Sequence, residues 1–210
     1  THIAISSDLR THASSSRVAA HDFCAASLTA DPDPRRAYLG DLPLPVVFVG
    51  RPTTAMGEGL TSVDSDNYGG GRLAARTLLE AGRRRLATIA GPAGYAPADE
   101  RTRGFRDKLA AWDVAPGPVV HGAFTMSSGA AAAASVLRRA PEVDGLFAGS
   151  DLMAVGALRV LESGGRRVPD DVSVVGFDDT VVAETCDPPL TTVRQPLREL
   201  GERAAGLVLD

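Results

Sequence analysis

The sequence has few of the features that indicate secretion, membrane insertion or a disulfide scaffold. Only two cysteines occur, Cys24 and Cys186, and they lie far apart in the chain. We interpret them as small apolar packing residues in a reducing cytoplasm. No apolar run approaches the roughly 20 residues of a membrane-spanning helix. No cationic start followed by an apolar core marks a secretion signal, so we expect a cytoplasmic protein with no membrane partner.

An excess of positive charge is also missing. The chain carries 22 Lys and Arg against 26 Asp and Glu, for a net charge of −4. Domains that wrap DNA are usually basic, so these residues alone should bind nucleic acid poorly. The arginine runs at 83–85, 138–139 and 166–167 fall at expected helix ends, where we interpret them as solvated charges that suit the helix dipole. The remaining composition, 44% hydrophobic and 23% charged, is that of a globular domain.

Patterns typical of catalysis, metals or nucleotides are absent as well. The four histidines form no HExxH or other zinc pattern, and no GxSxG occurs. The glycines at 69–71 do not form a phosphate-binding loop, and we expect them to allow close packing at a helix. Asp64 and Asp66 lack a third ligand at metal-binding spacing. We therefore predict no metal, no cofactor and no enzymatic activity, and a small α/β enzyme acting on a sugar or nucleotide is a poorly supported alternative.

What the sequence does contain is a regular alternation of short apolar runs and longer amphipathic segments. Strands are expected at 1–5, 23–28, 45–49, 86–90, 119–120, 145–148 and 172–176. Helices are expected at 72–79, 100–112, 125–139, 150–162 and 196–210, with Thr125 capping one of them. This alternation predicts an α/β fold with right-handed βαβ units and parallel sheets, on a chain long enough for one large domain or two small ones.

Three stretches carry a more specific signal. They are 63–74 (VDSDNYGGGRLA) followed by 81–86 (AGRRRL), then 149–157 (GSDLMAVGA) with 168–179 (VPDDVSVVGFDD), and finally 188–196 (PPLTTVRQP). In this order and spacing they resemble the lactose-repressor/galactose-repressor (LacI/GalR) family of bacterial transcription regulators. The resemblance covers about residues 45–210.

The resemblance implies a periplasmic-binding-protein-like fold: two parallel-sheet subdomains joined by crossover strands, with the ligand in the cleft between them. Residues 1–65 with 195–210 would form a partial N-terminal subdomain, and 66–194 the C-terminal one. The family's helix-turn-helix has no counterpart in this sequence, so we expect operator DNA to be bound only through a domain outside it.

The function implied by the resemblance is that of a ligand-sensing domain. A small-molecule effector, most simply a sugar, would shift the balance between two arrangements of the subdomains and so modulate operator binding. The sequence does not show whether the effector releases or promotes repression. The alternative is a secreted solute-binding protein of a sugar ABC transporter, although the 188–196 run favours the regulator.

The family pattern places two charged residues against the ligand. Asp178 follows a strand end, where a carboxylate can accept hydrogen bonds from two hydroxyls of a polyol; the alternative is a loop or cap aspartate. Arg101 stands three residues before 104–105 (GF), from which a guanidinium would offer paired donors; the alternative is a solvated arginine at a helix start. Asp179 is expected to be structural.

Four further ligand candidates follow from the same pattern. Phe124 would cover the apolar face of a sugar or else belong to the core. Ser150 would make a polar contact, while Asp151 beside it would cap the next helix. Gln195 would contact ligand or stabilise the hinge. Many family members carry an acidic or amide residue at the position of Gly50, followed by arginine. Because this chain has glycine there, Arg51 indicates an anionic or differently shaped ligand.

The resemblance also implies a homodimer. It places Leu152 and Val155 of one expected helix, together with Val182 and Cys186 in the 181–186 segment, at a two-fold contact. These positions carry more apolar side chains than a solvated face needs.

Overall fold

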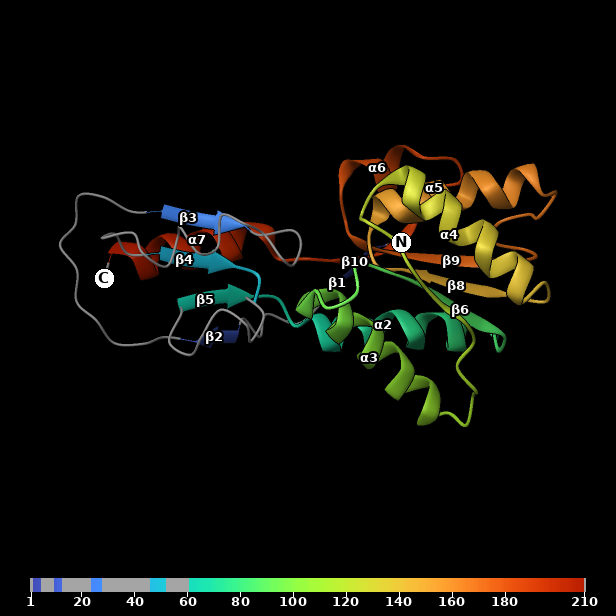
Figure 1. The fold of residues 1–210 in the computed structure, drawn as a ribbon, viewed down its shortest axis with the longest axis horizontal. Coiled ribbons are helices and arrows are strands. Elements are labelled where there is room, and N and C mark those ends of the chain that lie inside the picture. Colours follow the sequence, from blue (N-terminus) through green and yellow to red (C-terminus); the bar gives the residue numbers. More distant parts are fainter. Residues whose placement is uncertain (1, 5–9, 13–23, 28–45, 52–60, 210) are drawn as a thin grey trace. The chain divides into compact units, whose positions relative to one another are not determined.

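The computed structural model describes residues 2–4, 10–12, 24–27, 46–51 and 61–209 (Figure 1). The chain forms two units. Unit 1 comprises Thr1–Ile5, Asn67–Ala93 and Ala98–Gln195, and unit 2 comprises Ser6–Asp66, Gly94–Pro97 and Pro196–Asp210. The assignment of 1–65 with 195–210, and of 66–194, to the two subdomains of the family fold stays a prediction.

Unit 1 is built on a six-stranded sheet in the order β1-β10-β9-β8-β6-β7, in which every neighbouring pair is parallel. The strands are β1 His2–Ala4, β6 Leu86–Ala90, β7 Val119–His121, β8 Gly145–Ala148, β9 Ser173–Asp178 and β10 Thr191–Arg194. The helices are α2 Asn67–Glu80, α3 Ala96–Ala110, α4 Met126–Arg139, α5 Asp151–Ser163 and α6 Val181–Thr185. Figure 1 shows α2 and α3 on one face of the sheet and α4 and α5 on the other.

The neighbouring strands β6 and β8 of this sheet are buried along their whole length, because helices cover both faces. Successive residues of β8 alternate between the two apolar cores. Leu146 packs into the core beneath α4 and α5, whereas Phe147 lies in the core with α2 and α3. There its ring stacks on Phe105 at a centroid distance of 5.0 Å and lies 6.5 Å from Phe177.

Glycines permit close approach of helices on both faces. A Cβ on Gly71 would lie 2.0 Å from the carbonyl oxygen of Arg101 in α3, and one on Gly156 would lie 2.0 Å from the carbonyl oxygen of Met126 in α4. Gly71 is thus a packing residue inside α2, as expected. α2 begins at Asn67, five residues before the predicted start. The prediction missed this first turn because glycine inside a helix weakens the sequence signal for it.

Unit 2 contains a four-stranded sheet in the order β2-β5-β4-β3, with β2 antiparallel to β5 and the other pairs parallel. Its strands are β2 Arg10–His12, β3 Cys24–Ser27, β4 Val46–Val49 and β5 Thr61–Asp64, and its helix is α7 Leu197–Leu209. Leu200 and Ala204 of α7 pack against Val47 and Val63 of the sheet.

The predicted α/β class with parallel strands is confirmed. Strands 86–90 and 145–148 have the predicted bounds, and Thr125 caps α4 in a capping box with Ser128. His2–Ala4 forms a parallel pair with β10 at one edge of the unit 1 sheet.

Arg84 and Arg85 are exposed, as expected of solvated charges, whereas Arg83 is half-buried. Arg83 Nε donates to Ser173 Oγ at 2.9 Å, and Arg84 Nη1 donates to the carbonyl oxygen of Leu79 in the last turn of α2 at 2.8 Å. Carbonyls at a helix end lack intrahelical partners, and a nearby guanidinium supplies one. These arginines therefore connect the end of α2 to its surroundings.

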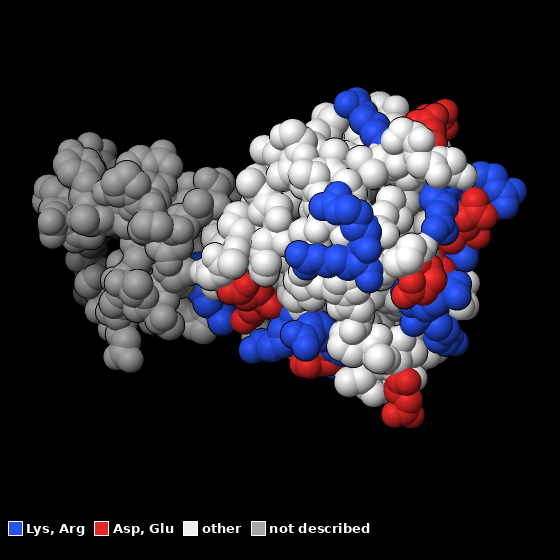
Figure 2. All heavy atoms as spheres, turned by 45° about the vertical axis from the view of Figure 1, so that its right-hand side comes forward, with Lys and Arg blue, Asp and Glu red and all other residues white. Residues whose placement is uncertain are grey.

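Charges of both signs are interspersed over the face of unit 1 seen in Figure 2, and neither sign dominates it. Within the part of the chain that the structure describes, no helix is long and apolar enough to cross a membrane.

Candidate functional site

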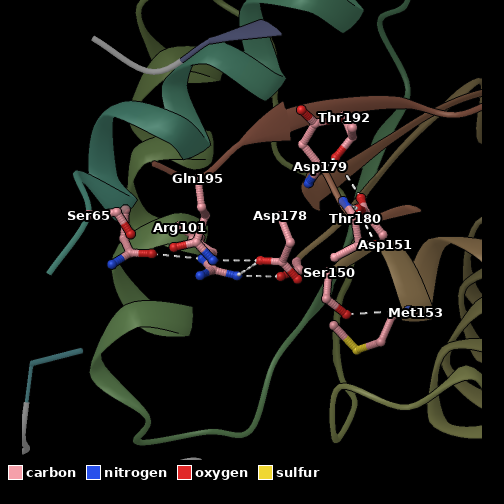
Figure 3. A network of polar contacts seen from close by, with 12 residues as sticks. Ser65, Arg101, Ser150, Asp151, Met153, Asp178, Asp179, Thr180, Thr192 and Gln195 are labelled. Atoms are coloured by element: carbon pink, nitrogen blue, oxygen red, sulfur yellow. Dashed lines mark hydrogen bonds and ion pairs between the residues drawn. The ribbon is translucent and has the colours of Figure 1, made fainter. Parts of the chain in front are cut away.

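Three of the predicted ligand residues lie together at the carboxyl edge of the unit 1 sheet (Figure 3). Asp178 ends β9, Gln195 directly follows β10, and Arg101 reaches in from α3. Gln195 Nε2 donates to Asp178 Oδ1 at 2.7 Å, and Arg101 Nη1 lies 3.5 Å from the same oxygen. This edge is where loops and helix ends converge in parallel α/β folds and where such folds bind ligands.

The Arg101 guanidinium is held in one orientation. Its Nε donates to Asn67 Oδ1 at 2.8 Å, and its Nη1 donates to the Gly149 carbonyl oxygen at 2.6 Å. Its plane lies over the Phe177 ring, 3.8 Å from the centroid, and the residue is 7% exposed. The alternative of a solvated arginine at a helix start is therefore wrong. A fixed, planar guanidinium is suited to directional hydrogen bonding with a polar ligand.

Asp178 is an ionisable group in an unusual setting. Burial raises the pKa of its carboxyl to about 6, although Arg101 and the hydrogen bond from Gln195 act in the opposite direction. Its backbone adopts φ +110° and that of Asp179 φ +60°, a region uncommon for residues other than glycine. A perturbed carboxyl on a strained turn is typical of functional sites.

The next loop of this edge corrects one sequence prediction. Ser150, not Asp151, is the N-cap of α5: its backbone is extended, and its Oγ accepts from Met153 N at 3.3 Å. Asp151 is the first helical residue, and its fully buried carboxylate accepts hydrogen bonds from Thr180 and Thr192. Both residue types are good N-caps, so the sequence does not decide between them. The ligand contact of Ser150 stays a prediction.

Asp179 points to a different partner from Asp178. Its carboxylate, 7% exposed, accepts from Arg194 Nε, and its backbone N–H donates to Thr192 Oγ1 at 3.4 Å. The two neighbouring aspartates are therefore separated in role, with Asp178 beside Arg101 and Asp179 tied to β10. This arrangement agrees with the structural role expected for Asp179.

The other two candidates, Phe124 and Arg51, belong to unit 1 and unit 2 respectively. Phe124 precedes the cap of α4, with φ +57°, and its half-buried ring lies against Gly91, where a Cβ would be 2.2 Å from Cζ. It also packs against the core beneath α4 and α5. Arg51 lies in unit 2, after β4 and Gly50. Ligand contacts of both residues stay predictions.

The predicted dimer residues differ in exposure. Leu152 is 42% exposed, and Val181, the first residue of the predicted 181–186 segment, is 75% exposed. Val182 is half-buried, whereas Val155 is buried within its own chain. Cys186 is a free thiol packed against the core, as expected of a packing residue. Burial raises the pKa of this thiol, so it is not poised as a reactive thiolate.

Sequence reasoning missed the polar residues that support the cluster. Asn67 was not singled out, because it opens a helix whose predicted start lay further along the chain. Thr192 lies inside a short strand and is fully buried, and the sequence carries no signal for its partner. Among the described residues, no group of three or more His, Cys, Asp or Glu side chains could hold a metal ion.

Comparison with known proteins identifies the family to which this chain belongs. A family model described as "Periplasmic binding protein-like domain" matches residues 75–210, more than half of the chain. A crystal structure of a LacI-family transcriptional regulator from Burkholderia phymatum is 35% identical, with a TM-score of 0.78, over 88% of this chain and 67% of that one. The chain belongs to the LacI/GalR family. The predicted resemblance and fold class are thereby confirmed.

Other members give a more detailed comparison. The chain is 47% identical to the HTH-type transcriptional regulator CelR of Thermobifida fusca over 180 residues, which are 85% of this chain and 53% of CelR. It is also similar to the structure of a CelR–cellobiose complex, with 45% identity and a TM-score of 0.82, covering 90% of this chain and 58% of that one. These relatives are regulators and not enzymes. The chain spans about half the length of the curated relatives it matches.

Proposed function

We propose that this chain is the effector-binding domain of a transcription regulator and that it binds a sugar without converting it. The observation that carries the proposal is the Arg101–Asp178–Gln195 cluster at the carboxyl edge of the unit 1 sheet. The whole protein would bind operator DNA through a separate domain and act in the cytoplasm. The interspersed charges on the visible face of unit 1 (Figure 2) suit a domain that does not itself bind DNA.

The cluster offers what a sugar hydroxyl requires. Ionised Asp178 is an acceptor for hydroxyl protons, and the Arg101 guanidinium is a donor to hydroxyl or ring oxygens. Both side chains are positioned in advance by neighbouring groups, so ordering them would take little of the binding free energy. Phe124 would cover the apolar face of the sugar, with Ser150 and Arg51 as further contacts.

Cellobiose is the first ligand to test, because the CelR relative in complex with cellobiose is 45% identical to this chain. Binding would regulate the whole protein only if the sugar prefers one arrangement of the protein over another, since a ligand shifts an equilibrium by its difference in affinity. The alternative of a transport receptor has less support, because the relatives described above are regulators.

We also propose that the domain forms a two-fold dimer through α5 and α6. These helices pack together, and Leu152 and Val181 expose large apolar side chains near the start of each. An exposed apolar pair on adjacent helices is suited to an isologous contact.

The test is calorimetric titration of the 210-residue chain with cellobiose, with ribose and glucose 6-phosphate as comparison ligands and chromatography of the recovered sugar. The expected result is saturable binding of cellobiose, one molecule per chain, with the sugar recovered unchanged. Tighter binding of the phosphorylated sugar would revise the ligand class toward the anionic ligand that Arg51 indicates. Conversion of the sugar, or no binding of any of the three, would overturn the proposal.

A further inference from the structure

Asp151 is a buried carboxylate that the proposed ligand contacts do not use. It is 0% exposed, and its two oxygens accept three hydrogen bonds. Thr180 donates to Oδ2 from its backbone N–H at 2.7 Å and from its hydroxyl at 2.9 Å, and the Thr192 hydroxyl donates to Oδ1 at 2.5 Å. Asp151 also stands in the first turn of α5, where the helix dipole favours negative charge.

These bonds hold the turn that follows Asp178. The Thr180 N–H binds Asp151 directly, and the Asp179 N–H donates to Thr192 Oγ1, whose own proton goes to Asp151 (Figure 3). Two successive N–H groups of the turn therefore depend on one carboxylate and one hydroxyl. Positive φ at both Asp178 and Asp179 persists only where the surroundings impose it, and this network supplies the constraint.

The neighbouring strand leaves room for the carboxylate. A Cβ on Gly176 of β9 would lie 2.5 Å from Asp151 Oδ1 and 2.6 Å from a methyl carbon of Leu190. Any other residue at 176 would displace a carboxylate that is already fixed by three hydrogen bonds. Glycine at position 176 therefore leaves the space that the Asp151 carboxylate occupies.

We propose that Asp151 and Thr192 are positioning residues, which fix the backbone of 178–180 and thereby aim the Asp178 carboxylate at the ligand. This inference rests on the proposed function in that Asp178 is taken as the ligand residue. Asp151 and Thr192 themselves need not touch the sugar. Their contribution is to hold Asp178 beside Arg101, 3.5 Å away, in the free protein.

The experiment compares Thr192→Val with Thr192→Ser. Valine keeps the volume of threonine but removes the hydroxyl, whereas serine keeps the hydroxyl and removes a methyl group. If the hydroxyl positions Asp178, the valine variant should bind cellobiose at least tenfold more weakly at 25 °C, and the serine variant should bind within about threefold of the parent chain. A purely packing role would give the opposite order.

A second readout needs no ligand. The Asp178 carboxyl can be titrated by NMR in the free protein, where its pKa of about 6 reflects burial in the present geometry. In the valine variant this pKa should fall toward its ordinary range as the carboxyl gains access to water, and in the serine variant it should not move. Thermal unfolding of both variants establishes that each is folded at the temperature of measurement.

The outcomes separate this inference from the proposed function. If the parent chain binds no sugar but the Asp178 titration moves in the valine variant alone, the proposed function fails and the positioning role stands. If the parent chain binds cellobiose and the valine variant matches it in both affinity and Asp178 titration, the positioning role is wrong and the proposed function stands.

Discussion

Replacing Asp178 by asparagine should stabilise the ligand-free protein at neutral pH while it weakens sugar binding. Asparagine keeps the shape of the side chain and an acceptor oxygen for Gln195 and Arg101, but it removes a charge from a buried position. Burial raises the pKa of this carboxyl from 3.8 to about 6. A rise of roughly two pKa units means that ionised Asp178 lowers the free energy of unfolding by about 3 kcal/mol at neutral pH.

Because folding raises the pKa of Asp178, the contribution of this carboxyl to the free energy of unfolding depends on pH. Between pH 3.8 and about 6, folded Asp178 retains a proton that the unfolded chain has released, so the parent protein loses stability as the pH rises through this window. The loss is complete above pH 6 and absent below pH 3.8. Asparagine does not titrate, so the stability difference between variant and parent should grow from near zero at pH 4 to about 1–3 kcal/mol at pH 7, a range in which the attraction of Arg101 for the ionised carboxylate is already included.

The assay is calorimetric unfolding of both proteins between pH 4.5 and 7.5. At neutral pH the variant should unfold several degrees higher, since about 1 kcal/mol corresponds to roughly 2–4 °C in a domain of this size. Asp171→Asn is the control, because the hydrogen bonds with Arg167 hold the pKa of Asp171 at about 2. Its effect should be destabilising and constant over this pH range. An Asp178→Asn variant that is less stable than the parent at pH 7, or a difference that does not change with pH, would refute the reasoning.

Three further predictions concern packing, the turn and the dimer. Gly156→Ala should destabilise the fold by about 1–3 kcal/mol, because the new methyl group meets the backbone of α4. Gly201→Ala in α7, where the space is open, should instead stabilise the fold by up to about 1 kcal/mol. Urea unfolding measures both changes. Asp179→Ala should reduce the free energy of unfolding by about 1–2 kcal/mol yet leave cellobiose affinity within twofold, as calorimetry would show. The double variant Leu152→Glu with Val181→Glu should sediment as a monomer at concentrations where the parent chain is a dimer, and a monomeric parent would contradict the proposed interface.

Much of the fold was predictable because its local signals are strong. The β6 sequence (LATIA) and the β8 sequence (GLFA) are short apolar runs of the kind buried on both faces of a parallel sheet, and both strands have the expected bounds. α2 was predicted too short, since its glycines weaken the local helical signal, although packing against α3 requires one of them, Gly71. Strand β10 went unpredicted as a separate element because it is short and carries buried threonine and exposed arginine.

The sequence predicted the main residues of the candidate site but not the hydrogen bonds that hold them in place. Family matching singled out Arg101, Asp178 and Gln195, and the structure brings the three side chains together. The network of Asp151 and Thr192 had no sequence signal, because a buried hydrogen bond between residues 41 positions apart depends on tertiary geometry. Asp151 was wrongly predicted as a cap for the same reason. The local sequence offers two good caps, and only the fold shows that Ser150 is the cap and that the Asp151 carboxylate binds the turn after β9.

The central claim is that Arg101 and Asp178 bind the sugar, and calorimetric titration of cellobiose into Arg101→Ala and Asp178→Ala tests it most directly. Each substitution removes a charge-assisted hydrogen bond from a largely buried position, so affinity should fall roughly tenfold to a hundredfold, or about 1.5–3 kcal/mol. Arg103→Ala is the matched control, since this exposed guanidinium lies two residues along the same helix, and it should bind like the parent chain. Binding of cellobiose by Asp178→Ala within twofold of the parent chain would contradict the account.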